Sequence, residues 1–506
     1  MTFKELYEFQ DQDVQKLSAK RHGLIGSEMG TGKTHEAIAI DQEWWEATDK
    51  NARRATFGTL IVAPLNTFDT WQEKYAEQMP RADIITIDRK NRGKFIAAIK
   101  GKKADVFLMH WDALRLMPEL RQFQFHLIIA DEVHRASNRK AQSTRSLKSL
   151  HTNHKLAMSG TASGDRPENL WSILNWLWPS YYTSYWNFRK HYCVEEKVYT
   201  DGAQAGYSKI VGVQNIGGLM REMSPWYIRH LKRDKCCEHH PEGVMSWLPE
   251  KTYDKIWVDL NPTQKKFYEQ MRKEMVSWVN EHEDTPLVAQ IVVVQLVRLQ
   301  QMALATPEVY QKQEHAKNPE TGEKLYNKDG TPTTITVQKV RLVAPSSKID
   351  AAKELILDES DKQFVVFSAS KQACYLAQQA FEEAGITCEV LSGDTPQSQR
   401  EGMVRRFNDG HYRVFIGVIQ AAAEGIDGLQ HSTDTAIFLD RSWSTIKNKQ
   451  AEDRLHRDGQ KNTVQIIDIM ARNTLDFGRH QRLETKWEWI RQILGDPTKA
   501  QRELTK

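Results

Sequence analysis

In GLIGSEMGTGKT, residues 23–34, an apolar strand-like run passes directly into a glycine-rich loop and a helix start. Small residues let backbone N–H groups close around phosphate oxygens, and the N-terminus of the following helix favours an anion. In such a loop the lysine reaches the β and γ phosphates and the hydroxyl after it ligates magnesium. A strict P-loop has glycine where Ser27 stands, so the generic match is incomplete. The residues expected to hold a nucleotide here are Met29, Gly30, Thr31, Gly32, Lys33 and Thr34, with the Thr34 hydroxyl on magnesium.

Two adjacent carboxylates end the apolar run HLIIADE at residues 126–132. In nucleotide hydrolases one such carboxylate holds the magnesium of the bound nucleotide, and a neighbouring one orients the attacking water. We assign Asp131 to the metal and Glu132 to the water. Either residue alone is an ordinary acidic end of a strand. The pair, downstream of a P-loop in the same α/β block, predicts a hydrolytic site.

Apolar strand-like runs alternate with helical stretches in two separate parts of the chain. The runs are rich in β-branched residues and mostly do not alternate with polar ones, as expected of strands covered on both faces. They lie at 23–26, 59–64, 105–111, 126–132 and 155–161, and again at 364–370, 388–393, 414–419, 436–443 and 464–471. This order is typical of doubly wound α/β domains with parallel sheets. The sequence therefore predicts two nucleotide-fold lobes with a site between them.

The second part contains QAEDRLHR, residues 450–457, in which Gln450, Arg454 and Arg457 recur at helical spacing. Two arginines directed at a γ-phosphate would neutralise the charge that develops in the transition state. An ordinary surface helix with ion pairs explains this segment equally well when it is considered alone. The catalytic interpretation depends on the other motifs.

The bulk properties exclude some classes of protein. The net charge is only +4, so a nucleic-acid partner would contact local basic patches, for which 89–103 and 229–235 are candidates. No apolar run is long enough to span a bilayer and the first residues lack an apolar signal core, so we expect a cytoplasmic protein without a membrane partner. The five cysteines lack ligand spacing, and CCEHH at 236–240 is a poor zinc chelate because its cysteines are adjacent.

These motifs together resemble the DExD/H-box helicase superfamily and, within it, the SWI/SNF-type DNA translocases. The family's P-loop reads D-E-M-G-x-G-K-T, which explains Glu28 and Met29, and its pattern Q-A-x-D-R-x-H-R-x-G-Q is matched by residues 450–460. Further matches are spread over nearly the whole chain: Phe9-Gln10, Ala63-Pro64-Leu65 with Trp71, Ser159-Gly160-Thr161, 169–179, Ile228-Arg229 to Lys232, Leu248-Pro249 with Lys251, Ser347-Lys348, Ser392-Gly393 and Glu424-Gly425-Ile426-Asp427. Asp427 replaces a common asparagine of the family.

The resemblance implies two tandem RecA-like lobes that hydrolyse ATP with Mg²⁺ at their interface. On the first lobe it implies that Gln10 reads the adenine, beside the P-loop and the two carboxylates. On the second lobe it adds Gly425 and Asp427 to the nucleotide site and makes Arg454 and Arg457 catalytic, together with Glu132. Double-stranded or branched DNA is the implied partner, held without sequence preference through phosphate contacts. Protein partners are not indicated, and the compact form is typical of a bacterial or viral genome-maintenance protein.

Two segments leave alternatives open. The aromatic cluster LWSILNWLWPSYYTSYWNF, residues 170–188, is interpreted as core, with a base-stacking surface as the alternative. Residues 311–341 are polar with Thr-Gly and Asp-Gly turn signals, which indicates an exposed β-hairpin insertion or a linker. That segment is either a tolerated surface loop or a hairpin that engages forks and junctions.

The sequence predicts lobe one at residues 1–230, helical and hairpin insertions at 231–346, and lobe two at 347–506. The expected activity is a DNA-dependent ATPase that moves on double-stranded DNA. The alternatives are a strand-separating helicase, the motor subunit of a restriction or recombination complex, and a DNA-binding scaffold that does not hydrolyse ATP. The presence of Lys33, Glu132 and Arg457 argues against the scaffold.

Overall fold

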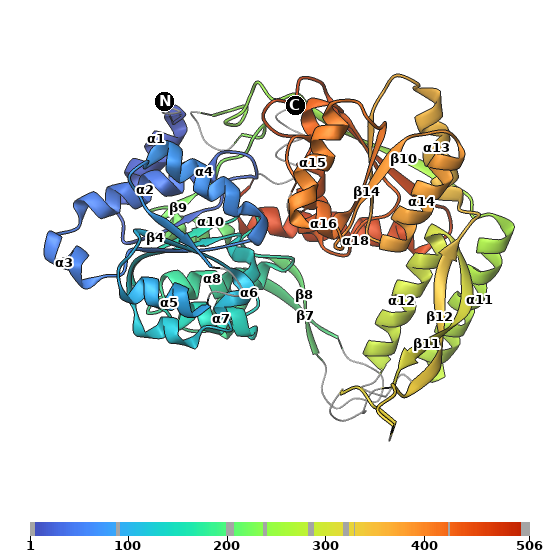
Figure 1. Ribbon diagram of the computed structural model, residues 1–506, viewed down its shortest axis with the longest axis horizontal. Helices are drawn as coiled ribbons and strands as arrows, with labels where there is room; N and C mark the ends of the chain where they lie inside the picture. The colour runs from blue at the N-terminus through green and yellow to red at the C-terminus, as the bar shows by residue number, and fades with distance from the viewer. Residues whose placement is uncertain are drawn as a thin grey trace.

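The computed structural model describes residues 6–87, 92–198, 207–235, 240–281, 288–316, 323–327, 329–423 and 426–496. Figure 1 shows two α/β lobes side by side, one built from the N-terminal half of the chain and one from the C-terminal half. Pairs of strands and helices extend from the lobes on one side of the molecule. The predicted fold class, two tandem doubly wound lobes with helical and hairpin insertions, is confirmed.

Seven strands form the sheet of lobe one in the order β3-β4-β2-β5-β6-β1-β9, and every neighbouring pair is parallel. Leu60 and Val62 pack into a core on one face, while Ile61 and Ala63 pack into a core on the other, because successive side chains of a strand point to opposite faces. Double coverage explains why the strands read as continuous apolar runs. The strands are β1 (His22–Ile25), β2 (Thr59–Ala63), β3 (Ile84–Thr86), β4 (Val106–His110), β5 (Gln124–Asp131), β6 (His151–Met158) and β9 (Tyr227–Ile228).

Helices connect these strands and cover both faces of the sheet. Among them, α8 carries the first part of the aromatic cluster. Leu170, Leu174 and Trp176 are buried there, so the core interpretation is confirmed for this helix, whereas Tyr181 and Trp186 are both 63% exposed. The helices of lobe one are α1 (Glu8–Ser18), α2 (Lys33–Ala47), α3 (Lys50–Ala55), α4 (Phe68–Gln78), α5 (Arg92–Lys100), α6 (Trp111–Leu114), α7 (Gln142–Lys148), α8 (Leu170–Leu177), α9 (Tyr185–Tyr192) and α10 (Ile216–Met223), with short 3-10 turns at Leu65–Thr67, Pro118–Gln122, Val133–Ala136 and Pro167–Asn169.

Six parallel strands form the sheet of lobe two in the order β10-β17-β16-β13-β15-β14. The edge strand β10 (Lys251–Val258) lies in the range assigned from the sequence to the insertion, but it pairs with β17 over its whole length. Half of its side chains are exposed and the rest only partly buried. Its sequence therefore lacks the apolar run that marks the other strands. The other strands are β13 (Phe364–Ser368), β14 (Cys388–Leu391), β15 (Val414–Val418), β16 (Thr435–Phe438) and β17 (Val464–Ala471).

The helices of lobe two cover a single large apolar core that contains Phe367, Phe415 and Phe438. They are α13 (Ser347–Asp358), α14 (Lys371–Glu383), α15 (Gln397–Asn408), α16 (Ile419–Ala423), α17 (Thr445–Glu452) and α18 (Leu475–Ile493), with a 3-10 turn at Leu429–His431. The helix α18 ends against the other lobe. Ile490, Ile493 and Leu494 belong to a core cluster of lobe one, so the end of the described chain joins the two lobes.

Two structures extend from the lobes at the lower side of Figure 1. An antiparallel pair of strands, β7 (Cys193–Val198) and β8 (Tyr207–Val213), leaves lobe one. Beside lobe two, the helices α11 (Pro262–Glu281) and α12 (Val288–Leu304) pack on each other and lead into β11 (Thr306–His315) and β12 (Thr334–Val343). The last two strands pair antiparallel from Thr306 with Val343 to His315 with Thr334, so the segment 311–341 contains a hairpin.

Within the described residues, no helix combines the length and the apolar character needed to cross a membrane.

Candidate active site

The loop between β1 and α2 has the geometry of a phosphate cradle. Gly30 and Gly32 have φ of 81° and 87°, a left-handed conformation that favours glycine, and Gly32 is the N-cap of α2. The first backbone N–H groups of α2 therefore point out of the helix into this loop. Lys33 Nζ donates to the carbonyl oxygens of Ser27 at 2.9 Å and Glu28 at 2.8 Å, so its side chain lies across the loop.

Gln10 lies against this loop from α1. Its Nε2 donates to the Thr31 carbonyl at 3.0 Å, and its Oε1 accepts from the Tyr7 N–H at 2.9 Å. A Cβ added at Gly32 would stand 2.3 Å from Gln10 Nε2, so glycine at this position gives the glutamine room. The structure thus brings the predicted adenine-reading residue and the P-loop together.

Asp131 and Glu132 lie at the carboxyl end of β5, at the same edge of the parallel sheet as the P-loop, which follows β1 two strands away. Asp131 Oδ2 accepts from Trp71 Nε1 at 3.1 Å, and its Oδ1 accepts from the Glu132 N–H at 2.8 Å. Burial, and then the charge of Glu132, raises the pKa of Asp131. Trp71, which follows the Ala63-Pro64-Leu65 match, is 1% exposed and holds Asp131 through its ring nitrogen.

Glu132 adopts a left-handed backbone, φ 47°, which turns its side chain away from the strand direction. Its Oε2 lies 3.1 Å from His134 Nδ1 and accepts from Ser159 Oγ at 3.4 Å. Burial opposes ionisation, but the hydrogen bond and charge of His134 and the charges of Lys33 and Arg454 lower the pKa of Glu132. The carboxylate is therefore ionised at neutral pH and can accept a hydrogen bond from a water molecule.

The two arginines of the second lobe lie beside this edge of lobe one. A Cβ added at Gly30 would stand 3.7 Å from Cβ of Arg457, and the Arg454 charge lowers the pKa of Glu132. Arg457 Nη1 contacts Asp427 Oδ1 at 2.8 Å, so the carboxylate that replaces the family's asparagine forms an ion pair with this arginine. Arg454 donates to the carbonyl oxygens of Ile426, at 2.7 Å, and Ala423. Gly425 lies outside the described residues.

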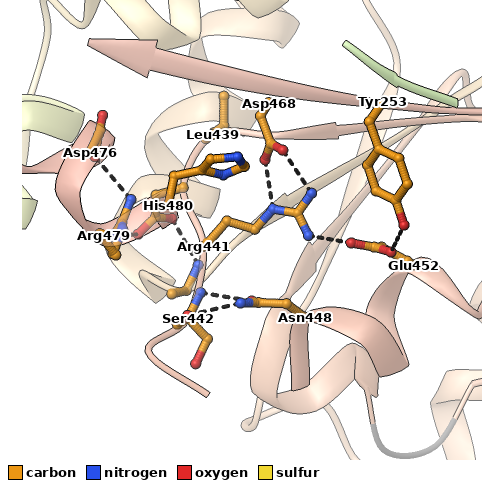
Figure 2. Close-up of polar contacts among 12 residues, drawn as sticks. Tyr253, Leu439, Arg441, Ser442, Asn448, Glu452, Asp468, Asp476, Arg479 and His480 are labelled. Carbon is orange, nitrogen blue, oxygen red and sulfur yellow. Dashed lines mark hydrogen bonds and ion pairs between the residues drawn. The ribbon is translucent and has the colours of Figure 1, made fainter. Parts of the chain in front are cut away.

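An ion-pair network fixes the segment that carries these arginines (Figure 2). Arg441 is bidentate to Asp468, at 2.6 and 2.9 Å, and its Nη1 donates to Glu452 Oε1 at 2.6 Å. The other carboxylate oxygen of Glu452 accepts from the Tyr253 hydroxyl at 2.8 Å. Glu452 is 1% exposed, and bidentate charge-assisted hydrogen bonds are the strong ones. The network therefore holds the end of α17, two residues before Arg454, to β17 and β10.

Lys232 is a cross-lobe contact that the predicted site residues did not include. It is 3% exposed; its N–H donates to Glu28 Oε2 at 2.7 Å, and its Nζ donates to the His456 carbonyl at 2.8 Å. Lys232 therefore joins the P-loop to the arginine segment. Arg229 is likewise buried and paired with Asp496, with Nε and Oδ1 at 2.6 Å. The segment 229–235, a candidate basic patch, thus contributes two buried cations to the lobe junction.

Asp165 was also not predicted as a site residue. It follows the Ser159-Gly160-Thr161 motif in lobe one, and its Oδ1 accepts from Ser444 Oγ of lobe two at 3.2 Å. A further residue, Glu36, is fully buried on α2 one turn after Lys33, and burial followed by the charge of Asp13 raises its pKa well above the usual value. Nothing in a single sequence distinguishes these positions from an ordinary loop and an ordinary helix.

A zinc site was considered from the sequence at residues 236–240. In the part of the chain that the structure describes, no cluster of three metal-ligating side chains occurs. Cys236 and Cys237 themselves lie outside that part. Cys193, Cys374 and Cys388 are buried free thiols.

The fold and the site define a two-lobe P-loop enzyme with an arginine-bearing segment at the lobe junction. The SNF2-related domain family matches residues 12–306, and the helicase conserved C-terminal domain matches residues 347–459. The chain therefore belongs to the SNF2-related family.

Several curated proteins are similar over nearly the whole chain. An uncharacterized ATP-dependent helicase of Mycoplasma pneumoniae is 24% identical over 490 residues, which cover 96% of this chain and 41% of that protein. A probable ATP-dependent DNA helicase of Arabidopsis thaliana is 24% identical over 464 residues, covering 90% of this chain and 40% of that protein. The transcription regulatory protein SNF2 of Saccharomyces cerevisiae is 25% identical over 470 residues, covering 90% and 25%. The chain spans between 25% and 41% of the length of these relatives.

Among solved structures, the SWI2/SNF2 ATPase core of Sulfolobus solfataricus in complex with dsDNA has a TM-score of 0.41 at 18% identity, and covers 98% of both chains. The core domain of the same organism described without DNA has a TM-score of 0.39 at 19% identity, covering 99% of this chain and 92% of that one.

Proposed function

We propose that the chain hydrolyses ATP at the junction of its lobes and that this hydrolysis depends on DNA. The observation that carries the proposal is the approach of Arg457 and Arg454 to the P-loop and to Glu132. A binding scaffold needs a nucleotide pocket, but it does not need an ionised carboxylate and two arginines at the same place. Both accelerate hydrolysis, because charge develops on the transferred group and water must be oriented.

Each residue has a proposed role. Gln10 recognises the base, and the N–H groups of Met29 to Lys33, together with the Lys33 ammonium, hold the phosphates. The Thr34 hydroxyl and Asp131 hold Mg²⁺; the buried oxygens of Asp131, each already fixed by one N–H, suit a hard cation that prefers carboxylate oxygen. ATP supplies the phosphoryl group that water accepts. Glu132 orients that water, while Arg454 and Arg457 stabilise negative charge, and Asp427 positions Arg457 beside the loop.

The proposed DNA partner is double-stranded, and the proposed motion is translocation along it. The support is family membership together with similarity to a probable ATP-dependent DNA helicase. Two lobes that open and close around a nucleotide can step along a polymer when each lobe holds it in turn. Phosphate contacts suit such stepping, because they carry no sequence information.

The test is ATP hydrolysis measured with duplex, single-stranded, forked and four-way DNA, with Lys33→Ala as the inactive control. Duplex should stimulate the rate strongly, and raising the salt concentration should weaken the effect. Equal rates with and without every one of these DNAs would contradict the proposal.

A finer proposal concerns branched DNA and the hairpin β11–β12. Val309 on β11 is 62% exposed and Ile335 on β12 is 50% exposed, so the hairpin buries little core of its own. Apolar and basic side chains on a projecting hairpin can enter between strands where a fork or junction opens. Replacing residues 311–341 with a short Gly-Ser linker should leave duplex-stimulated hydrolysis intact and reduce junction processing sharply. Unchanged junction processing would leave the hairpin as a surface loop.

A further inference from the structure

Five side chains of lobe one, two cations and three aromatic rings, form a connected row that we name the aromatic ladder. Lys148 Nζ lies 4.7 Å from the ring centre of Trp171, whose ring is 5.6 Å from that of Tyr185. Arg139 lies over Tyr185, with Cζ at 4.3 Å from the ring centre, and 5.9 Å from that of Trp186. The five residues come from α7, α8, α9 and the loop before α7, so folding brings them together from separate parts of the sequence.

The outer end of the ladder is exposed but firmly held. Trp186 is 63% exposed, whereas Phe188 and Tyr192 of the same helix are buried. The Tyr192 hydroxyl donates to Glu222 Oε1 at 2.8 Å, and Ser184 caps the helix by accepting from the Asn187 N–H. A large ring on an anchored helix loses little conformational freedom on binding. Trp186 is therefore suited to contact a partner that covers its exposed ring.

The two cations of the ladder have no ion-pair partner among the described residues, although the charge of Glu168 acts on Tyr185. Within the described chain no carboxylate pairs with Arg139 or Lys148, and Lys148 Nζ donates only to the Asn175 amide oxygen, at 2.7 Å. Burial, and then the charges of Arg139 and Lys155, lower the pKa of Lys148 to about 8. Cations that repel one another at a surface favour an anionic partner.

We propose that the aromatic ladder binds an unpaired nucleic-acid strand. Flat rings stack on nucleobases of any sequence, and guanidinium and ammonium groups contact the phosphates between them. A duplex keeps its base faces stacked inside, so only an unpaired strand can use Trp186 in this way. The proposal rests on the DNA-dependent activity proposed above and adds a substrate class to it: the unpaired strand of a fork or junction.

The experiment measures affinity for labelled oligothymidine and for a blunt duplex of equal charge by fluorescence anisotropy. Trp186→Ala and Arg139→Ala should each weaken oligothymidine binding about tenfold, which matches the 1–3 kcal/mol typical of one stacked base. Trp186→Phe should retain most of the affinity, because a ring remains. Duplex affinity and duplex-stimulated ATP hydrolysis should stay unchanged in all three variants.

Phe477→Ala is the matched control, because Phe477 is a 53% exposed aromatic residue of lobe two whose ring neighbour is Trp257 and not a cation. It should bind oligothymidine normally. Undiminished oligothymidine binding by Trp186→Ala would overturn the proposal, as would a polyglutamate peptide that competes as well as oligothymidine, since the ladder would then recognise charge alone. Failure of the wild type to hydrolyse ATP with any DNA would contradict the proposed function instead, while the binding comparison would still decide the role of the ladder.

Discussion

Asp165 of lobe one accepts a hydrogen bond from the Ser444 hydroxyl of lobe two, with Oδ1 and Oγ 3.2 Å apart, and its Oδ1 also lies 3.5 Å from the Ile446 nitrogen. Ser444 is the N-cap of α17, and Arg454 follows two residues after the end of that helix. Asp165 therefore contacts the N-terminal end of α17, and the arginines follow the C-terminal end of the same helix. Because Arg441 and Glu452 hold that segment as one unit, a contact at its start sets the position of its end.

Asp165→Ala should therefore lower kcat of DNA-stimulated ATP hydrolysis fivefold to tenfold, since a net hydrogen bond contributes ~1 kcal/mol. The KM for ATP should change little, because Asp165 does not contact the P-loop residues. Asp165→Asn retains an acceptor oxygen and should restore most of kcat. In a double-mutant cycle, the losses of Asp165→Ala and Ser444→Ala should be less than additive, although Ser444→Ala keeps a cost of its own because Ser444 also caps α17. Fully additive losses would show that the two residues act independently.

Removal of Arg457 tests the site across the lobes. Arg457→Ala should reduce DNA-stimulated turnover by ~10³-fold or more, because an arginine that stabilises transition-state charge contributes that much. ATP binding, measured with a fluorescent analogue, should largely survive, since Lys33 and the loop remain. Asp427→Asn is the matched comparison, because it breaks the ion pair with Arg457 but keeps the guanidinium. Near-normal turnover of Arg457→Ala would exclude a role for this arginine in hydrolysis at the P-loop.

Glu132 and Lys33 should fail in different ways. Glu132→Gln keeps size and hydrogen bonding but removes the charge, so it should bind ATP with Mg²⁺ and stall. Lys33→Ala should weaken nucleotide binding as well as hydrolysis, because the ammonium contacts phosphate. Equilibrium binding and single-turnover hydrolysis, measured on the same preparations, separate the two defects. If both variants hydrolyse ATP at the normal rate, the P-loop has another role.

The local motifs were predictable from the sequence because each is a contiguous stretch whose chemistry demands particular residues. The P-loop, the two carboxylates at the end of β5 and ten of the thirteen strands of both sheets were found in this way, but the short strands β3 and β9 were not. The strand β10 was not, because its exposed edge carries Thr252, Asp254 and Lys255 in place of an apolar run. Only pairing with β17 makes it a strand.

Contacts between the lobes were harder to predict for a different physical reason. Lys232 and Asp165 act through residues that are more than 200 positions away in the sequence, namely His456 and Ser444. Neither has a spacing pattern that marks its partner. The same is true of the aromatic ladder, since the stretch 170–188 is mostly core and only the fold shows which rings reach the surface beside Arg139.

Three buried histidines should make the stability of the protein depend on pH. Burial lowers the pKa of His22 to about 3 and the pKa values of His126 and His456 to about 4. In the unfolded chain a histidine titrates near 6.5. Between these values the unfolded state binds more protons than the folded state, so the stabilising effect of the neutral rings is fully present above about pH 6.5 and is lost as the pH falls.

His126 offers the cleanest measurement, because its ring is fully buried, 5.0 Å from the Trp45 ring and 5.2 Å from the His154 ring. At pH 5 the burial of His126 lowers the free energy of unfolding by ~2 kcal/mol, at 1.36 kcal/mol for each pH unit below 6.5. Buried carboxyls with raised pKa values, such as Asp41 at about 6, act in the opposite direction, so the variant must be compared with the wild type and not judged alone. Between pH 7.5 and pH 5, the free energy of unfolding in urea should fall by ~2 kcal/mol less for His126→Phe than for the wild type. Replacing the exposed His411 with Phe should leave this fall as large as it is in the wild type. An identical pH dependence in His126→Phe and the wild type would show that this ring is not kept neutral by the fold.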